Sequence, residues 1–126
     1  MLQPTDNPTT EIDKNSRMVT NSNLHYHIIK GIIDNGFAPT VDDLSDIFQA
    51  DKEQVIKGLH DLQDYHGVVL HPNEPKVWVI HPFSLAPTNF YVQTKNGQWW
   101  GNCAWCSLGV AALLNEDVKI TTTIGA

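Results

Sequence analysis

The sequence lacks long apolar runs. No stretch of its 126 residues approaches the roughly 18 consecutive apolar residues that a membrane-spanning helix needs. The first residues, MLQPTDNPTTEIDKNSRMVTNSN, have no apolar centre of a secretory signal, and they include acids that transit peptides avoid. We therefore expect a cytoplasmic protein without a membrane partner.

Basic residues are scarce and scattered. Eight lysines and arginines stand against 14 aspartates and glutamates, which gives a formal net charge of -6. Because the basic residues are spread along the chain, the sequence predicts no positive surface for phosphate groups. Nucleic acid is therefore disfavoured as a partner, and the composition leaves the oligomeric state open.

Cysteine is also scarce, with Cys103 and Cys106 as the two examples. In a reducing compartment, such a pair serves as metal ligands, catalysts or free thiols more often than as a structural disulfide. A zinc site would need two further ligands, and the six histidines show no paired spacing that supplies them. We expect most of the histidines to be ordinary surface residues.

The distribution of polar and apolar residues divides the chain into three parts. Residues 1–22 are too polar to join a core and predict a flexible tail. Residues 23–81 predict a winged-helix-like domain, and residues 82–126 predict a second unit that carries both cysteines.

Three helices are expected in the first domain, because apolar residues recur there at helical spacing. The first helix takes Ser22 or Asn23 as its N-cap and stops at Asn35-Gly36. The capping signals of the other two are Thr40 with Asp43 and Asp51 with Gln54, and Gly67 is placed to end the third helix.

Two β-branched stretches, 68–70 and 77–80, follow these helices and are separated by the turn-forming HPNEP. Three helices followed by a hairpin are typical of a winged helix-turn-helix. This architecture often binds DNA, but the acids of the third helix favour a scaffolding or dimerising module here.

The sequence of the second unit predicts strands and one helix. A proline-bounded connector, HPFSLAPT, leads to a strand at 90–94, a turn at Asn96-Gly97 and a return through 98–100. A helix over 103–114 and a strand over 118–124 follow. The fold class is therefore α+β, with a winged helix-turn-helix before a smaller unit of strands and one cysteine-bearing helix.

The two cysteines open the predicted helix at positions i and i+3. The first turn of a helix favours thiolate, and this spacing puts both sulfurs on one side, where they can hold one soft metal ion. The alternative is a pair of small buried apolar residues beside Trp99, Trp100 and Trp105.

The part of the chain from His81 onward contains a recognisable series of motifs. These are His81-Pro82-Phe83-Ser84, a strand with a tight turn, the run Cys103-Ala104-x-x-x-Leu108-Gly109-Val110 and a β-branched strand. In this series the chain resembles the organomercurial (alkylmercury) lyase family. The resemblance extends more weakly to residue 24, where the family has its own winged-helix-like region. The resemblance thus implies the first part of an alkylmercury lyase-like α/β unit.

The resemblance also implies site residues. The family's helix opens with a cysteine that binds the mercury of R–Hg, and an aspartate three residues later assists proton transfer; no organic cofactor is used. Cys103 takes the first position, whereas Cys106 replaces the aspartate, and the family's later cysteine has no counterpart before residue 126. A second register would place Cys106 on the first cysteine and Gly109 on the aspartate, but it loses the Leu-Gly-Val run.

Three functions follow as hypotheses. The first is an organomercurial lyase-like protein, in which Cys103 attacks mercury and Cys106 is the second thiol or proton donor, with Hg(II) as product. The second is a non-catalytic domain that binds mercury or another thiophilic metal through the same two residues. The third is a winged-helix regulator whose cysteines respond to metal or oxidation.

Overall fold

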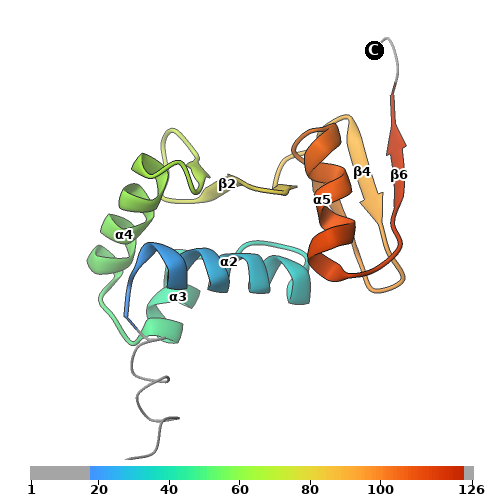
Figure 1. Cartoon of the computed structure of the whole chain (residues 1–126). Coiled ribbons are helices and arrows are strands. Elements are labelled where there is room, and N and C mark those ends of the chain that lie inside the picture. The colour runs from blue at the N-terminus through green and yellow to red at the C-terminus, as the bar shows by residue number, and fades with distance from the viewer. Residues whose placement is uncertain (1–17, 124–126) are drawn as a thin grey trace, which may run out of the picture.

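The computed structural model describes residues 18–123, which form an α+β fold. The helices in this range are α2 (Asn21–Asn35), α3 (Val41–Phe48), α4 (Lys52–Asp64) and α5 (Ala104–Leu114). The strands are β1 (Val69–Leu70), β2 (Val77–Ile80), β3 (Phe83–Ser84), β4 (Phe90–Gln93), β5 (Gln98–Gly101) and β6 (Lys119–Thr122). Figure 1 shows α2, α3 and α4 grouped at one end and α5 beside β4 at the other.

Helix α2 begins earlier than expected, inside the range assigned to the tail. Its N-cap is Thr20, whose hydroxyl accepts a hydrogen bond from the Asn23 N–H at 3.2 Å, so neither Ser22 nor Asn23 is the cap. Val19, one residue earlier, already packs against the core. The prediction of a tail over 1–22 is therefore wrong for residues 19–22, whereas residues 1–17 lie outside the described range.

The starts of α3 and α4 follow the predicted capping signals. Thr40 and Asp43 form a reciprocal capping box, with hydrogen bonds of 3.0 and 3.1 Å between each side chain and the other residue's N–H. At α4, the Gln54 side chain accepts from the Asp51 N–H at 3.3 Å. Both helices therefore begin where polar side chains accept hydrogen bonds from free N–H groups.

The end of α4 differs from the prediction. Gly67 was expected to end the helix, but the residue that adopts the left-handed conformation is His66, at a φ of 67°. The Gly67 N–H instead reaches back to the Leu62 carbonyl at 2.9 Å. A Cβ at residue 67 would collide with the Leu62 side chain, so glycine is required there for close approach and not for its φ angle.

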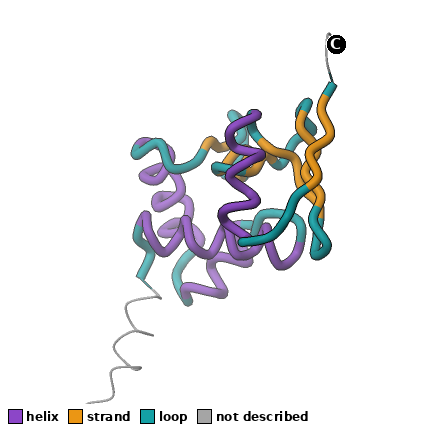
Figure 2. The backbone as a smooth tube through the Cα atoms, turned by 45° about the vertical axis from the view of Figure 1, so that its right-hand side comes forward, coloured by secondary structure: helices purple, strands orange, loops and turns teal. Residues whose placement is uncertain are grey.

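The six strands of the described residues form one antiparallel sheet, in the order β1-β2-β3-β5-β4-β6. The stretch HPFSLAPT was expected to be a connector only, but it contains β3, which joins the β1–β2 hairpin to β5. Three helices and a hairpin do occur in the predicted order, although the winged-helix assignment itself stays a prediction. Figure 2 shows strand segments both beside the helices and near the C-terminal end.

One apolar core runs through both halves of the chain. It includes Leu24, Ile28 and Ile32 of α2 together with residues of the sheet and α5. The buried indole N–H of Trp99 on β5 donates to the Ile32 carbonyl at 2.9 Å, across 67 residues of sequence. This bond fixes the C-terminal half of α2 against the sheet, and thereby places α2 opposite the start of α5. Within the described residues, no helix has the length and apolar character needed to cross a membrane.

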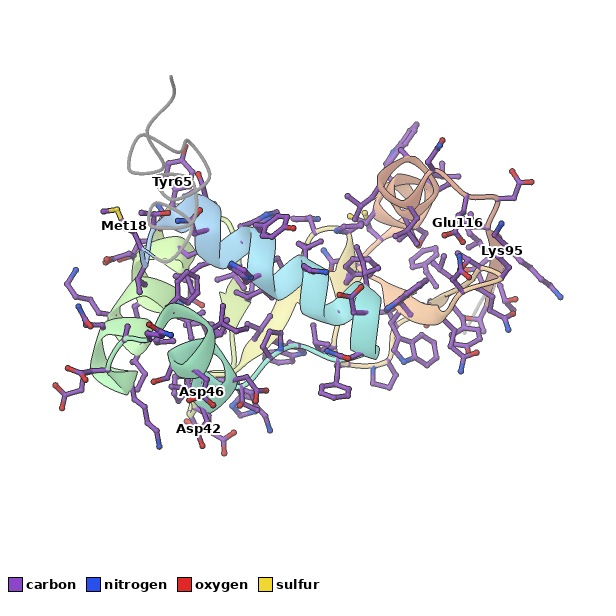
Figure 3. The ribbon with its side chains drawn as sticks, turned by 90° about the horizontal axis from the view of Figure 1, so that it is seen from below. Met18, Asp42, Asp46, Tyr65, Lys95 and Glu116 are labelled. Carbon is purple, nitrogen blue, oxygen red and sulfur yellow. The ribbon has the colours of Figure 1, made fainter. Side chains whose placement is uncertain are left out.

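The lysines of the helical half are paired with acids. Lys30 contacts Asp34 at 2.7 Å, Lys52 contacts Asp42 at 2.8 Å, and Lys57 contacts Asp61 at 2.9 Å. Figure 3 shows Asp42 and Asp46 at the outer side of α3. These pairs leave little net positive charge on this half, in keeping with the prediction against nucleic acid, which stays a prediction.

Candidate functional site

Cys103 is the N-cap of α5. It follows β5 by two residues, with an extended backbone (φ -153°, ψ 178°), and its sulfur accepts a hydrogen bond from the Cys106 N–H at 3.3 Å. Serine, threonine or aspartate usually fills such a position. A sulfur at this position therefore lies in the positive potential of the helix start, which favours its anionic form.

The two predicted site residues lie in direct contact. Their sulfurs are 3.0 Å apart, which is longer than a disulfide bond of about 2.05 Å, so both are free thiols that share a hydrogen bond. Both side chains are half-buried. The alternative of two buried apolar residues is therefore wrong, because neither cysteine is buried.

The pKa values of the two thiols are shifted in opposite directions. The pKa of Cys103 is lowered by its hydrogen bond with the Cys106 side chain and by backbone N–H groups of the first turn. The pKa of Cys106 is raised, first by burial and then by its interaction with Cys103. Cys103 is therefore the group that becomes thiolate first, while Cys106 keeps its proton.

This difference predicts unequal reactivity of the two cysteines. Below the pKa of an ordinary thiol, Cys103 should react with iodoacetamide faster than Cys106, because thiolate is the reacting form. The difference should shrink as the pH rises and both sulfurs ionise. Mass spectrometry of peptides from briefly alkylated protein resolves the two sites, and faster modification of Cys106 at neutral pH would contradict the assignment.

His81 is the site residue that the sequence did not identify. Its Nδ1 lies 3.0 Å from the Cys106 sulfur, although the two residues are 25 positions apart. His81 is exposed, like the surface position expected for most of the histidines, but it also contacts a site residue. No spacing signal could have found it, because the contact depends on β3 pairing with both β2 and β5.

The turn that carries His81 is fastened to the start of α5. Residues 81 and 82 connect β2 to β3, and the Pro82 carbonyl accepts a hydrogen bond from the Asn102 N–H at 3.1 Å. Phe83 pairs with Gly101, the last residue of β5. The histidine and the two cysteines are thus held by three segments of one sheet.

Gly101 lets α5 approach the sheet closely. Ser107 is fully buried and donates its hydroxyl to the Cys103 carbonyl at 2.8 Å. A Cβ at residue 101 would overlap the Ser107 side chain and lie 3.2 Å from its Cα. Glycine at this position therefore sets the distance between the start of α5 and β5.

Gly101→Ala should destabilise the fold by about 1–3 kcal/mol, because the added methyl group meets backbone that cannot move freely. Gly109→Ala is the matched control, since a Cβ there meets its nearest atom, on Pro82, at an ordinary 3.7 Å. That variant should gain up to roughly 1 kcal/mol from higher helix propensity. Urea denaturation measures both, and equal stabilities would refute the close-packing argument.

A groove of about 820 Å³ opens beside Cys106. It lies between α2 and α5, whose placement Figure 3 shows from below. Its apolar lining consists of Tyr26, Ile29, Ile33, Pro82, Trp105 and Leu113. Its polar lining includes His25, whose pKa is lowered by burial, and the paired Lys30 and Asp34. The groove can therefore hold an apolar group next to a thiol.

The site has few ligands for a hard or tetrahedral metal ion. Within residues 18–123, no group of three or more histidine, cysteine, aspartate or glutamate side chains is arranged to hold a metal. Two adjacent sulfurs suit instead a soft ion that accepts two ligands.

Comparisons with known proteins agree with this chemistry. Residues 83–126 match the model of the MerB family, alkylmercury lyase. The resemblance predicted from the sequence is confirmed. The alkylmercury lyase match contains β3 to β6 and both cysteines, whereas His81 lies two residues before it.

A solved structure of the mercury-bound form of MerB2 has the same fold, with a TM-score of 0.65 and 18% sequence identity. The similarity covers 92% of this chain and 58% of that one, so this chain spans little more than half the length of that alkylmercury lyase-related structure. The fold likeness therefore extends to the helical half, which the family match leaves out. A search of curated proteins gave no match.

Proposed function

We propose that this chain is an organomercurial lyase-like protein, in which Cys103 and Cys106 bind the mercury of R–Hg and cleave the carbon–mercury bond. The observation that carries the proposal is the pair of sulfurs 3.0 Å apart at the start of α5, beside an apolar groove. The family match over the same segment supports it.

Cys103 makes the first bond in this proposal. Its lowered pKa supplies a thiolate, the form in which sulfur attacks a soft metal. The Cys103 sulfur bonds to mercury and displaces the weakly held anion of R–Hg–X, and the organic group R stays attached. The apolar lining of the groove gives R a place to lie.

Cys106 completes the reaction as the second thiol. Its sulfur bonds to the same mercury, its proton is passed to the carbon of R, and the carbon–mercury bond breaks with its electron pair on carbon. The products are the hydrocarbon R–H and Hg(II) held by two sulfurs. Cys106 keeps its proton until this step because its pKa is raised. The proposed reaction needs no organic cofactor.

A second candidate is a non-catalytic domain that binds mercury through the same two thiols. Cys106 occupies the position where the resemblance implies an aspartate, and a thiol does not supply a carboxylate's charge at neutral pH. This departure lowers the expected rate of protonolysis but leaves two soft ligands for mercury. We propose a cytoplasmic location for either function, since both need reduced thiols.

The proposal is tested by incubating the chain with phenylmercury and measuring benzene in the gas phase. We expect slow release from the parent and none above background from the Cys103→Ser/Cys106→Ser double variant. Competitive titration with Hg(II) runs in parallel and should give one ion per parent chain. Tight Hg(II) binding without benzene would favour the second candidate, and equal binding by the double variant would refute both.

A further inference from the structure

Three groups contact Cys106. The Cys103 sulfur and His81 Nδ1 each lie 3.0 Å from the Cys106 sulfur, and the Asn102 side chain also hydrogen-bonds to Cys106. The contact with Cys103 is explained by helix capping. The contact with His81 is not required by the packing, because His81 is exposed.

The proposed function passes the Cys106 proton to the carbon of R but names no group that carries it there. When mercury neutralises Cys103, the Cys106 thiol must give up its proton before its sulfur can close on the metal. Imidazole is the side chain that most readily takes a proton near neutral pH. In the tautomer that carries its hydrogen on Nε2, the His81 Nδ1 is an acceptor directed at the Cys106 sulfur.

The other titratable groups near this position are less suited to the task. From α5, Cys103 is occupied by mercury at that stage. From α2, the groove presents His25, Tyr26, Lys30 and Asp34, and the carboxylate among them is paired with Lys30 at 2.7 Å. Within residues 18–123, none of the four groove side chains of α2 hydrogen-bonds to the Cys106 sulfur.

We propose that His81 is a catalytic residue, which accepts the thiol proton of Cys106 so that the second sulfur can bond to mercury. This inference rests on the proposed function. The S–H bond of Cys106 breaks, an N–H bond forms on His81, and the sulfur electron pair bonds to mercury. The carbon–mercury bond then breaks with its electron pair on carbon, which takes the proton held on His81. The imidazole returns to its neutral form.

The test measures Cys106 alone, in the full-length Cys103→Ser chain, where a neutral hydroxyl stands for a sulfur neutralised by mercury. The rate of alkylation by iodoacetamide is followed from acidic to alkaline pH. In the Cys103→Ser/His81→Asn chain, the amide can hydrogen-bond to the sulfur but cannot take its proton. We expect the rate near pH 7 to fall about tenfold and the midpoint to rise by about one pH unit.

Cys103→Ser/His25→Asn is the matched control, because His25 lines the same groove and should leave the alkylation profile unchanged. Far-ultraviolet circular dichroism checks that each variant folds, and His81→Gln replaces His81→Asn if the latter does not. Superimposable pH profiles with and without His81 would overturn the inference.

Failure of the proposed function would be seen in a different measurement. In that case the parent chain would bind no Hg(II). The alkylation profile decides the role of His81 whether or not mercury binds.

Discussion

Cys103→Ser and Cys106→Ser should each lower the affinity for Hg(II) by roughly 10²- to 10⁴-fold. In the parent, the second sulfur lies 3.0 Å from the first and is already held by the first turn of α5. Closing the chelate therefore costs little additional freedom, whereas a single thiol must find its second ligand in solution. Titration in competition with a small dithiol of known affinity measures the difference.

Leu108→Ser is the control for this experiment, because it places a serine on an exposed position of α5 outside the groove. It should leave the affinity unchanged. A single-serine variant that binds as tightly as the parent would show that the remaining sulfur finds another ligand and that the chelate is assigned wrongly.

Cys106→Asp should increase the release of hydrocarbon from arylmercury, by roughly tenfold, because a carboxyl group at this position resembles the family's proton-transferring aspartate. The added Cys103→Ser substitution should abolish that release, with a loss of at least about 10²-fold, since no sulfur remains to bind the mercury. Gas-phase detection of the hydrocarbon under single-turnover conditions measures both changes.

Cys106→Asn is the matched control for the aspartate variant, since it has nearly the same shape without an acid to give a proton. It should release no more hydrocarbon than the parent. If Cys106→Asp retains arylmercury but produces no hydrocarbon, the chain is better described as a mercury-binding relative without lyase activity.

The local elements of this fold could be predicted because their signals are short in sequence. The Thr40–Asp43 capping box and the Asn96-Gly97 turn both formed where expected, since each depends on residues three or fewer positions apart. The placement of Cys103 and Cys106 at the start of a helix was confirmed for the same reason, although Cys103 is the cap and not part of the first turn.

The parts that could not be predicted depend on pairing between distant strands. β3 contains two residues, too few for any alternating pattern, yet it joins the β1–β2 hairpin to β5. The contact between His81 and Cys106 exists only because of that pairing. The start of α2 was misplaced for a different reason, since Thr20, Ser22 and Asn23 are all good caps and packing of Val19 decides among them.

The hydrogen bond from the Trp99 indole to the Ile32 carbonyl joins the two halves of the chain, so it affects whether either half can be separated from the other. A fragment limited to residues 83–126 would contain both sulfurs, but it would expose the indole N–H and the apolar faces that α2 covers. The proposed mercury site therefore depends on the helical half for a complete core. Any lineage that gained or lost the helical half would have had to rebuild the core at the same time.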